Sequence, residues 1–431
     1  MEHVPKSKKQ KLAGQHSGCM FYFEKKGRYC SLSKHADSLY CGIHRPQVSG
    51  EEERVQCPHG NHTVAKSSLA KHVKICPDYV KLKELESKPY FERGFNKGLD
   101  TKVNLPHVEG KNTLSRRRFA SIQLMGEKGF QDLLDKIERL HSDLECSLRE
   151  KSYIEPSSMG ASNIPEGDHQ RRSLMKKKHS SQQDSIIGNM MKWGFLDHPK
   201  TVKYMEFGSG KGYLTGRMID CVPSVQDVVL IDRTSFKLTV DRNLRDKNLQ
   251  RVRCDIADFN PSKVENPSAW VAYGKHLCGP ATDMTIRCVA NQMHTDGCKP
   301  MGLAIASCCH HLTSWDQYVG HEFMNEHDIS PEEFELMCYM CAWATCGHSS
   351  SKNTLKQQDD NDCMKHEHGP WRPQATIGRA RRIEIGTKCK DLIDRGRILY
   401  CRQVLEWNAA DVTFVDSSIS LENRLLLAKR P

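Results

Sequence analysis

The chain has 431 residues, with 64 Lys and Arg against 53 Asp and Glu, and its formal net charge is +11. This length allows one large domain or two to three smaller ones, and the positive balance favours a polyanionic partner. No apolar run approaches the length needed to cross a bilayer, which excludes a membrane-spanning protein. The chain has 19 cysteines but no apolar signal-peptide region at its amino terminus, so we expect an intracellular protein of the nucleus, the cytoplasm or both, with reduced thiols.

A first set of potential zinc ligands lies in residues 16–46. It consists of Cys19, Cys30, Cys41 and His44. The spacing C-x10-C-x10-C-x2-H is regular, and the intervening stretch FYFEKKGRYC is too short to bury a core. A bound metal would supply the missing folding free energy. We therefore expect a CCCH-type zinc module here.

A second set lies in residues 54–80, which include the sequence CPHGNHTVAKSSLAKHVKIC. It consists of Cys57, His62, His72 and Cys76. A structural zinc needs four nitrogen or sulfur ligands at tetrahedral positions. His72 and Cys76 lie four residues apart in a predicted helix, so both project from one face. His59 is a rival for His62, because either histidine could reach the ion from the preceding turn. We therefore expect a CHHC-type zinc module.

Residues 113–150 are predicted to form an amphipathic helical segment. Apolar residues recur there at steps of three and four, at Phe130, Leu133, Leu134, Ile137, Leu140, Leu144 and Leu148. Packing against a neighbouring domain is the expected use, with a short coiled coil as the alternative. The polar residues 151–178 indicate a linker, and the polar stretch 348–371 indicates a flexible insert in the following domain.

Three basic clusters add to the positive charge. They comprise Arg116 to Arg118, then Arg171, Arg172 and Lys176 to Lys178, and then Arg379, Arg381 and Arg382. A single cluster of this kind is typical of a solvated face. Three clusters beside two zinc modules favour a nucleic-acid partner.

Residues 179–428 alternate between predicted strands and helices, which is typical of an α/β domain. The strand TVKYMEF runs into GSGKGYLTGRMI, so Gly208, Gly210 and Gly212 form a tight turn that opens a helix. Such a turn lets the backbone approach a ligand closely and places helix amides beside it.

Carboxylates follow the next two predicted strands. Asp232 ends DVVLID, where it can accept hydrogen bonds from ribose hydroxyls, and RVRCDIADF supplies Asp255 and Asp258 where a side chain can contact an adenine amino group. The turn lacks the third glycine of G-x-G-x-x-G and the GK[ST] of a P-loop, and no second mononucleotide half is recognisable. The pattern favours S-adenosylmethionine over NAD as the cofactor.

Potential catalytic residues cluster after the fourth and fifth strands, where a parallel sheet holds its reacting groups. WVAYGKHLCGPATD ends with Lys275, His276, Cys278 and Asp283, and MGLAIASCCHHL ends with Cys308, Cys309, His310 and His311. Neighbouring side chains of a strand point to opposite faces, so the CCHH run is not expected to wrap one zinc ion. Some of these groups are expected to line the pocket and the others to pack as small buried residues. For Cys338, Cys341 and Cys346 we favour burial in the core over metal binding.

Several of these motifs resemble those of one known family. They are GKHLCGPATD, SCCHH followed by W-x-x-YVG, WATCG, IGTKCKDLIDRGRILY and SLEN. With the two zinc modules, over residues 16–80 and 179–428, they are similar to the eukaryotic tRNA 2′-O-methyltransferase family that modifies nucleotide 4 of the acceptor stem. The resemblance implies a class I, Rossmann-like S-adenosylmethionine methyltransferase domain. It also implies methyl transfer to a ribose 2′-hydroxyl in tRNAs such as those for glycine, proline and histidine.

The sequence departs from the family pattern at two places. Leu312 and Thr313 follow CCHH where the family usually has Arg and Cys, so a phosphate contact from that arginine is in doubt. Pro280 stands where a small or aliphatic residue is usual. The glycine turn, KHLCG and CCHH all persist, which indicates a diverged member with retained activity.

Methyl transfer to a ribose requires a group that accepts the hydroxyl proton as attack proceeds. His276 can serve as that base, while Lys275 lowers the pKa of the hydroxyl or holds a neighbouring phosphate. Asp283 can orient either side chain, and His310 is the alternative base.

The zinc modules and basic clusters are expected to grip the tRNA acceptor stem by shape and phosphate contacts, since double-stranded RNA gives side chains little access to base edges. One alternative is a catalytically inactive, zinc-dependent RNA-binding or splicing adaptor, because CHHC modules also resemble those of a splicing protein. Another is a methyltransferase for a protein or a small molecule. The glycine turn and Asp232 argue against the first, and the basic clusters argue against the second. The sequence does not define the oligomeric state.

Overall fold

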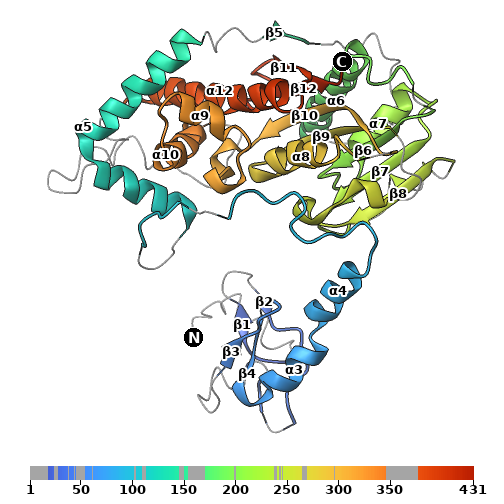
Figure 1. Cartoon of the computed structure of the whole chain (residues 1–431). Coiled ribbons are helices and arrows are strands. Elements are labelled where there is room, and N and C mark those ends of the chain that lie inside the picture. The colour runs from blue at the N-terminus through green and yellow to red at the C-terminus, as the bar shows by residue number, and fades with distance from the viewer. Residues whose placement is uncertain are drawn as a thin grey trace. The chain divides into compact units, whose positions relative to one another are not determined.

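The computed structural model describes most of the chain as two compact units, residues 1–88 and 89–431 (Figure 1). The described residues are 18–23, 28–36, 38–42, 44, 54–60, 62–100, 103–108, 113–144, 150–153, 170–198, 200–236, 240–241, 244, 246–264, 269–295, 297–345 and 377–431, without the side chains of 170–178. The polar insert 348–371, most of the linker 151–178, Leu148 and Cys346 lie outside them. Within these ranges, no helix is long and apolar enough to cross a membrane.

The first unit is built from short elements. They are β1 (Tyr22–Phe23), β2 (Arg28–Tyr29), β3 (Arg54–Gln56), β4 (Thr63–Ala65), η2 (Lys66–Ser68), α3 (Leu69–Ile75) and α4 (Pro77–Glu86). β1 pairs with β2 and β3 with β4, both antiparallel. Cys76 separates α3 from α4 with a ψ of 124°, and Pro77 begins α4 because a first-turn residue needs no amide hydrogen.

The described core of this unit is made of potential metal ligands. Its buried side chains are Cys19, Cys30, Cys41, His44, Cys57 and Cys76. Burial of so little apolar surface cannot offset the conformational entropy lost on folding, so small units of this kind depend on a staple such as a metal ion.

The second unit is organised around one mostly parallel sheet of eight strands. The strands are β5 (Glu150–Lys151), β6 (Lys203–Phe207), β7 (Asp227–Asp232), β8 (Asn248–Arg253), β9 (Trp270–Cys278), β10 (Pro300–Cys308), β11 (Asn408–Thr413) and β12 (Arg424–Lys429). Their order is β5-β11-β12-β10-β9-β6-β7-β8, and β12 runs antiparallel to both of its neighbours. The central strands are apolar and buried over most of their length, as expected for a sheet covered on both faces.

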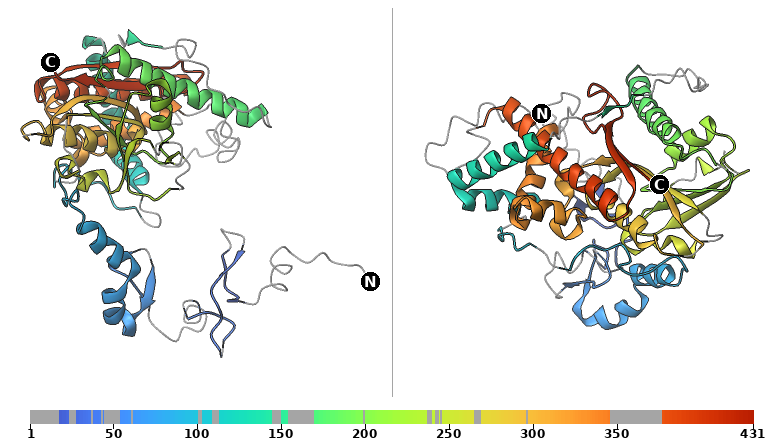
Figure 2. Two further views of the ribbon diagram at one scale, coloured as in Figure 1. Left: turned by 90° about the vertical axis from the view of Figure 1, so that its right-hand side faces the viewer. Right: turned by 45° about the horizontal axis from the view of Figure 1, so that its top comes forward.

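Helices cover both faces of this sheet, either directly or by packing on another helix (Figure 2). They are α5 (Leu114–Asp143), α6 (Gln170–Lys192), α7 (Tyr213–Cys221), α8 (Pro280–Asn291), α9 (His321–Glu326), α10 (Pro331–Cys341) and α12 (Arg379–Gln403), with single turns η5 (Ile256–Asp258), η6 (Pro261–Lys263), η7 (His310–Leu312), η8 (Trp315–Gln317) and η9 (Ala342–Thr345). α6 and α7 share one core cluster with the sheet, and α8 and α12 pack along β9 and β11 respectively. The parallel strands β6 to β10 present their carboxyl ends along one edge of the sheet.

The segment predicted over 113–150 contains α5, which is interrupted by a kink. Gly126 has φ 75° and ψ 175°, a conformation that glycine adopts without the strain a side chain would cause. The buried apolar residues of α5 are Ile122, Phe130, Leu133, Leu134, Ile137 and Leu140. They join α10 and α12 in a core cluster of their own, so the apolar stripe packs within the second unit and not as a coiled coil.

Arg118 corrects the prediction of a basic surface cluster over residues 116–118. Its side chain is only 1% exposed and pairs with the buried carboxylate of Glu335. Its guanidinium also donates to the backbone carbonyls of His311, at 2.6 Å, and Thr313. Arg118 therefore fastens the loop after β10 to α5 and α10, and Arg116 is the neighbour that stays exposed.

Arg118→Ala is expected to lower the free energy of unfolding by about 3–5 kcal/mol, because it leaves the carboxylate of Glu335 buried without its partner. Urea denaturation followed by circular dichroism measures this change. The matched control, Arg116→Ala, removes an exposed charge from the same turn and should change stability by less than about 0.5 kcal/mol. Equal effects of the two substitutions would show that the buried ion pair does not stabilise the unit.

Candidate functional site

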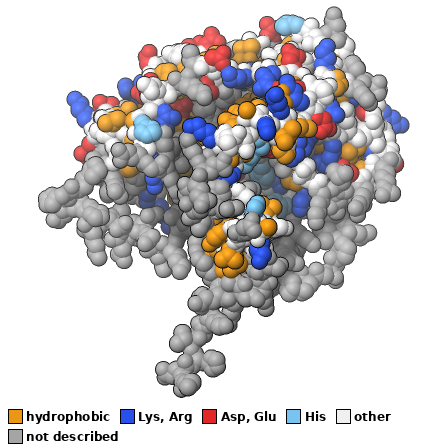
Figure 3. Space-filling view, turned by 90° about the horizontal axis from the view of Figure 1, so that it is seen from below, with side chains coloured by type: hydrophobic (Ala, Val, Ile, Leu, Met, Phe, Trp, Pro, Cys, Tyr) orange, Lys and Arg blue, Asp and Glu red, His pale blue; other side chains and the backbone are white. Residues whose placement is uncertain are grey.

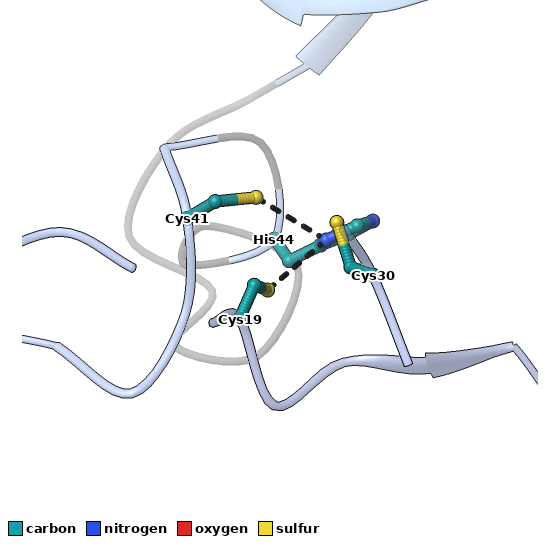
Figure 4. Close-up of side chains that lie close together, drawn as sticks. All are labelled: Cys19, Cys30, Cys41 and His44. Carbon is teal, nitrogen blue, oxygen red and sulfur yellow. Dashed lines mark hydrogen bonds between the residues drawn. The ribbon is translucent and has the colours of Figure 1, made fainter. Parts of the chain in front are cut away.

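The four side chains of the predicted CCCH module lie together and are buried (Figure 4). Their ligand atoms all lie within 4.8 Å of one another. The Nδ1 atom of His44 is 3.4 Å from Cys19 Sγ and 3.3 Å from Cys41 Sγ. The ring of Phe21 stacks on His44 at 4.0 Å between centroids and fixes the orientation of the imidazole. Three sulfurs and one nitrogen converging in this way fit a tetrahedral zinc ion.

The second Cys/His set also converges. Cys57 Sγ lies 3.7 Å from Cys76 Sγ and 3.3 Å from His72 Nε2. His62 is the histidine that joins them, with its Nε2 atom 2.8 Å from the Nε2 atom of His72. His59, the rival ligand, instead places its ring against Tyr79 at 4.5 Å between centroids. This donor set fits zinc in the same way as the first.

The glycine turn follows β6 and is left-handed at each glycine. Gly208, Gly210 and Gly212 have φ of 64°, 51° and 80°. The carboxylate of Asp232, at the end of β7, accepts hydrogen bonds from the Gly210 amide at 2.9 Å and from the Thr234 amide at 2.8 Å. A Cβ atom at Gly210 would meet nothing closer than the ring of Phe236 at 4.0 Å, so the turn has an open side on which a ligand can lie.

Two residues that sequence reasoning missed also hold this turn. Arg251 donates to the carbonyl of Gly210 at 2.9 Å and forms an ion pair with Asp241. Glu206 is buried and accepts from the amide of Thr215 at 3.1 Å, and burial raises the pKa of its carboxyl to about 7. The alternation of side chains along β8 does not predict that Arg251 points toward the glycine turn. That contact depends on the register between β7 and β8, which the sequence does not specify.

The side chain of Ser209 supports the presence of a ligand at the turn. Its Oγ atom is buried and has no hydrogen-bond partner among the described residues. A buried hydroxyl without a partner costs free energy, and a polar ligand atom would satisfy it. The turn therefore has a place for a polar ligand atom beside Ser209.

Asp255 and Asp258 lie at the carboxyl end of β8. Asp255 caps η5 by accepting from the Ala257 amide at 3.1 Å, and its side chain remains partly exposed. Asp258 instead accepts from the Gly94 amide at 2.7 Å and fastens the 89–100 segment to the sheet. Of the two carboxylates, Asp255 is the one left free to meet a ligand.

Lys275 and His276 lie near the carboxyl end of β9, on the same edge of the sheet as the glycine turn. The Nζ atom of Lys275 is 3.3 Å from the Nδ1 atom of His179 on α6. Burial lowers the pKa of Lys275 to about 8, although the charge of Glu206 opposes this shift. His276 has φ 62°, which is unusual for a residue with a side chain. The residue as a whole is exposed, but burial around its imidazole lowers the pKa of the ring. Strained backbone of this kind often occurs at functional sites.

The structure places Asp283 in a buried ion-pair network and not beside Lys275 or His276. Its carboxylate accepts two hydrogen bonds from Arg397, at 2.6 and 3.1 Å, and one from the Val319 amide at 3.3 Å. The prediction that it orients Lys275 or His276 is therefore wrong. The physical reason is that α8 turns its first-turn carboxylate inward, toward α12.

His310 belongs to the same network. Its Nε2 atom lies 2.8 Å from Asp394 and its side chain is 0% exposed. Burial lowers the pKa of His310, although the neighbouring carboxylate of Asp394 opposes the shift. A ribose hydroxyl cannot reach a side chain that is fully enclosed, so His310 acts as a structural anchor and is not suited to the role of alternative base.

Cys278 and Cys308, at the ends of β9 and β10, come together with Cys309, while His310 of the CCHH run is buried against Asp394. The run therefore does not wrap one ion, and it divides into partly exposed and buried groups as expected. Cys278 Sγ lies 3.8 Å from Cys308 Sγ, which lies 3.3 Å from Cys309 Sγ. Cys309 lies beyond the last residue of β10 and has a left-handed backbone, so its side chain does not follow strand alternation. Cys338 and Cys341 are buried in the core, as predicted.

The second basic cluster lies in the part of α6 whose side chains are not described, and the third begins α12. In the third cluster, Arg381 forms an ion pair with Glu384 at 2.8 Å. Figure 3 shows Lys and Arg side chains gathered in clusters on the visible face, with Asp and Glu side chains between them. The pairing of Arg381 reduces the positive charge that the third cluster offers to phosphates.

A mostly parallel α/β domain with a glycine turn, preceded by two Cys/His clusters, fits a transferase that carries zinc-binding modules. The family model described as Methyltransferase TRM13 matches residues 181–429, and the model described as CCCH zinc finger in TRM13 protein matches residues 17–45. The chain therefore belongs to the Methyltransferase TRM13 family.

Three relatives extend this similarity over nearly the whole chain. The Homo sapiens protein named tRNA:m(4)X modification enzyme TRM13 homolog is 28% identical, over 95% of this chain and 94% of its own length. The Saccharomyces cerevisiae protein named tRNA:m(4)X modification enzyme TRM13 is 28% identical, over 95% of each chain. The Vanderwaltozyma polyspora protein of the same name is 29% identical, over 99% of each chain.

His62→Ala is expected to remove one zinc ion per chain, because it deletes a ligand of the second set, whereas His59→Ala should retain the wild-type zinc content. Zinc measured by plasma mass spectrometry on the purified full chain tests this pair. Loss of zinc from the His59 variant and not from the His62 variant would reverse the assignment.

Proposed function

We propose that this protein is an S-adenosylmethionine-dependent tRNA methyltransferase that methylates the ribose 2′-hydroxyl of nucleotide 4 in the acceptor stem. Its substrates would include tRNAs such as those for glycine, proline and histidine. The observation that carries this proposal is the shared sheet edge in a member of a methyltransferase family. The glycine turn, which Asp232 holds, follows β6, and Lys275 and His276 lie near the end of the neighbouring parallel strand β9. The names of the relatives, which specify position 4 of tRNA, support the choice of nucleotide.

The topology supports a class I, Rossmann-like domain. The strands that carry the glycine turn and the two carboxylates are β6, β7 and β8, which lie in that order on one side of β9. On the other side β10 is followed by the antiparallel β12 and then by β11. The order reverses between β6 and β9, and ligands of open α/β sheets bind at such a switch point, outside the carboxyl ends of the strands.

The residues at this switch point suit S-adenosylmethionine. The amides of the glycine turn and Ser209 would meet its amino acid portion, Asp232 would accept from its ribose hydroxyls, and Asp255 would approach the adenine amino group. When bound, the cofactor supplies a methyl group activated by a sulfonium. The protein's own contribution is to hold the acceptor hydroxyl in line with that group and to keep the ends of β6 and β9 fixed.

Lys275 and His276 would act on the ribose hydroxyl that accepts the methyl group. His276 is exposed at the strand end and is held by a left-handed backbone, so its imidazole can receive the proton of the ribose hydroxyl. Lys275 keeps its ammonium beside it, where a positive charge favours the developing alkoxide or binds a neighbouring phosphate. Neither role requires Asp283 or His310, which stabilise the loops beneath the site.

The two zinc fingers would provide RNA binding. Recognition of a double-stranded acceptor stem depends mainly on shape, phosphate and 2′-hydroxyl contacts. A small rigid unit held by metal ions can offer such contacts without reading base edges. The net charge of +11 on the chain favours binding of a polyanion such as RNA.

Incubation of the full chain with methyl-labelled S-adenosylmethionine and unmodified tRNA transcripts is expected to label nucleotide 4. Alkaline cleavage maps the label, because a methylated 2′-oxygen blocks cleavage of the adjacent phosphodiester.

Asp232→Ala should weaken cofactor binding about ten- to a hundredfold, since it removes charge-assisted hydrogen bonds of about 1.5–3 kcal/mol. Asp227→Asn, at the opposite end of β7, is the matched control and should behave as wild type. Tight tRNA binding without any methyl transfer would instead indicate an inactive RNA-binding adaptor.

Lys275→Arg is expected to remove an alkaline decline in activity. The pKa of Lys275 is lowered to about 8, so the wild-type ammonium loses its charge as pH rises through that value. The groups that face it are His179, Glu206 and His276. Arginine stays charged throughout this range, so kcat/KM of the variant should stay level above pH about 8. Lys299→Arg, an exposed change before β10, is the control and should keep the decline; an unchanged decline in the Lys275 variant would contradict the assignment.

A further inference from the structure

The thiols of Cys278, Cys308 and Cys309 form a third sulfur cluster, outside both zinc fingers. We propose that these three residues bind a Zn²⁺ ion as thiolates, at a site in the methyltransferase domain itself. The three Sγ atoms all lie within 4.8 Å of one another. This inference goes beyond methyl transfer to tRNA and does not depend on it.

The distances between the sulfurs suit a single ion. A Zn–S bond of about 2.3 Å in tetrahedral geometry places two sulfurs about 3.8 Å apart. Cys278 Sγ and Cys308 Sγ are separated by 3.8 Å, and Cys308 Sγ and Cys309 Sγ by 3.3 Å. Cys57 Sγ and Cys76 Sγ, in the second finger, are separated by 3.7 Å. The third cluster is therefore as compact as an expected zinc site of the same chain.

The fold constructs this cluster from two strand ends. Cys278 and Cys308 are the last residues of β9 and β10, and they face each other in the parallel register. Cys309 then adopts φ 52° and ψ 47°, so its sulfur comes back to that of Cys308. This left-handed conformation is uncommon for a residue with a side chain, and it is the feature that brings a third sulfur to the pair.

The loops after the two strands are also held close to each other. The amide of Gly279 donates to the carbonyl of Cys308 at 3.0 Å. A Cβ atom at Gly279 would lie 2.5 Å from the Cβ atom of Leu312, so only glycine permits this approach. The position of Cys278 opposite Cys308 is therefore fixed by backbone contacts, independently of any interaction between the sulfurs.

The site differs from the fingers in having an open position. Cys278 is exposed, and Cys308 and Cys309 are half-buried, whereas the cysteines of both fingers are buried. Among the described residues, no His, Asp or Glu atom completes the set within the same distance. A zinc ion with three protein ligands keeps a fourth position for water or another oxygen ligand. That position would lie on the edge of the sheet that also carries Lys275 and His276.

Zinc is the favoured ion because soft thiolates select zinc, copper(I) and iron–sulfur clusters, and zinc needs no redox partner. A disulfide between two of the three cysteines is the competing use of the same atoms. Its S–S bond of about 2.05 Å would require the sulfurs to approach each other further. Metal analysis and intact mass distinguish these possibilities.

Zinc content of the full chain, purified under reducing conditions and desalted, tests the proposal. Cys278→Ser and Cys308→Ser are each expected to bind one equivalent of zinc less than wild type, with both fingers still loaded. Cys221→Ser, a partly exposed cysteine of α7 outside all three clusters, should match wild type. In cobalt-substituted protein, the thiolate-to-cobalt charge-transfer band should lose intensity in the first two variants and not in the control.

Equal zinc content in wild type and the Cys278 variant would overturn the proposal. So would iron or copper in place of zinc, or a wild-type mass lower by two hydrogen atoms without bound metal. Cys278 is exposed, so its serine variant should fold even if the Cys308 variant does not, and melting temperature checks this. Methyl transfer is not a readout here, so failure of this proposal would leave the proposed function unaffected.

Discussion

The ion pair between Arg397 and Asp283 holds the floor of the candidate site. Both side chains are almost fully buried, and the shortest of their contacts is 2.6 Å. Arg397 lies on α12 and Asp283 in the first turn of α8, so the pair ties the helix after β9 to the carboxyl-terminal part of the domain. Arg397 also donates to Asp394, which contacts His310 in the turn after β10. A buried charge without its partner is costly, so these contacts fix both strand ends together.

The positions of the reactive groups follow from that restraint. The ends of β9 and β10 lie above the network, and each carries residues in left-handed backbone, at His276 and at Cys309. Such conformations persist only where the surroundings hold them in place. The glycine turn after β6 reaches the same edge and is held from the outside by Arg251. One edge of the sheet thus combines a glycine turn with an open side, a lysine of lowered pKa and a cluster of thiols.

The cysteine clusters arise in two physically different ways. In the fingers, ligands lie close in sequence, and Cys57 and Cys76 are brought together by a short hairpin and one helix. In the domain, Cys278 and Cys308 meet only because β9 and β10 are neighbours in the sheet. The first arrangement needs the metal to complete its core, whereas the second is placed by a core that is complete without it.

The sequence by itself determined whatever depends on local spacing. The two Cys/His sets, the glycine turn and the carboxylate of Asp232 were all predicted from residues close together in the chain, and the structure brings each set together. Only the tertiary structure decided which polar residues are buried. It turned Arg118, Asp283 and His310 inward and left His276 exposed, although all four are polar residues. The reason is that burial and ion pairing depend on contacts between residues far apart in sequence, which no local spacing specifies.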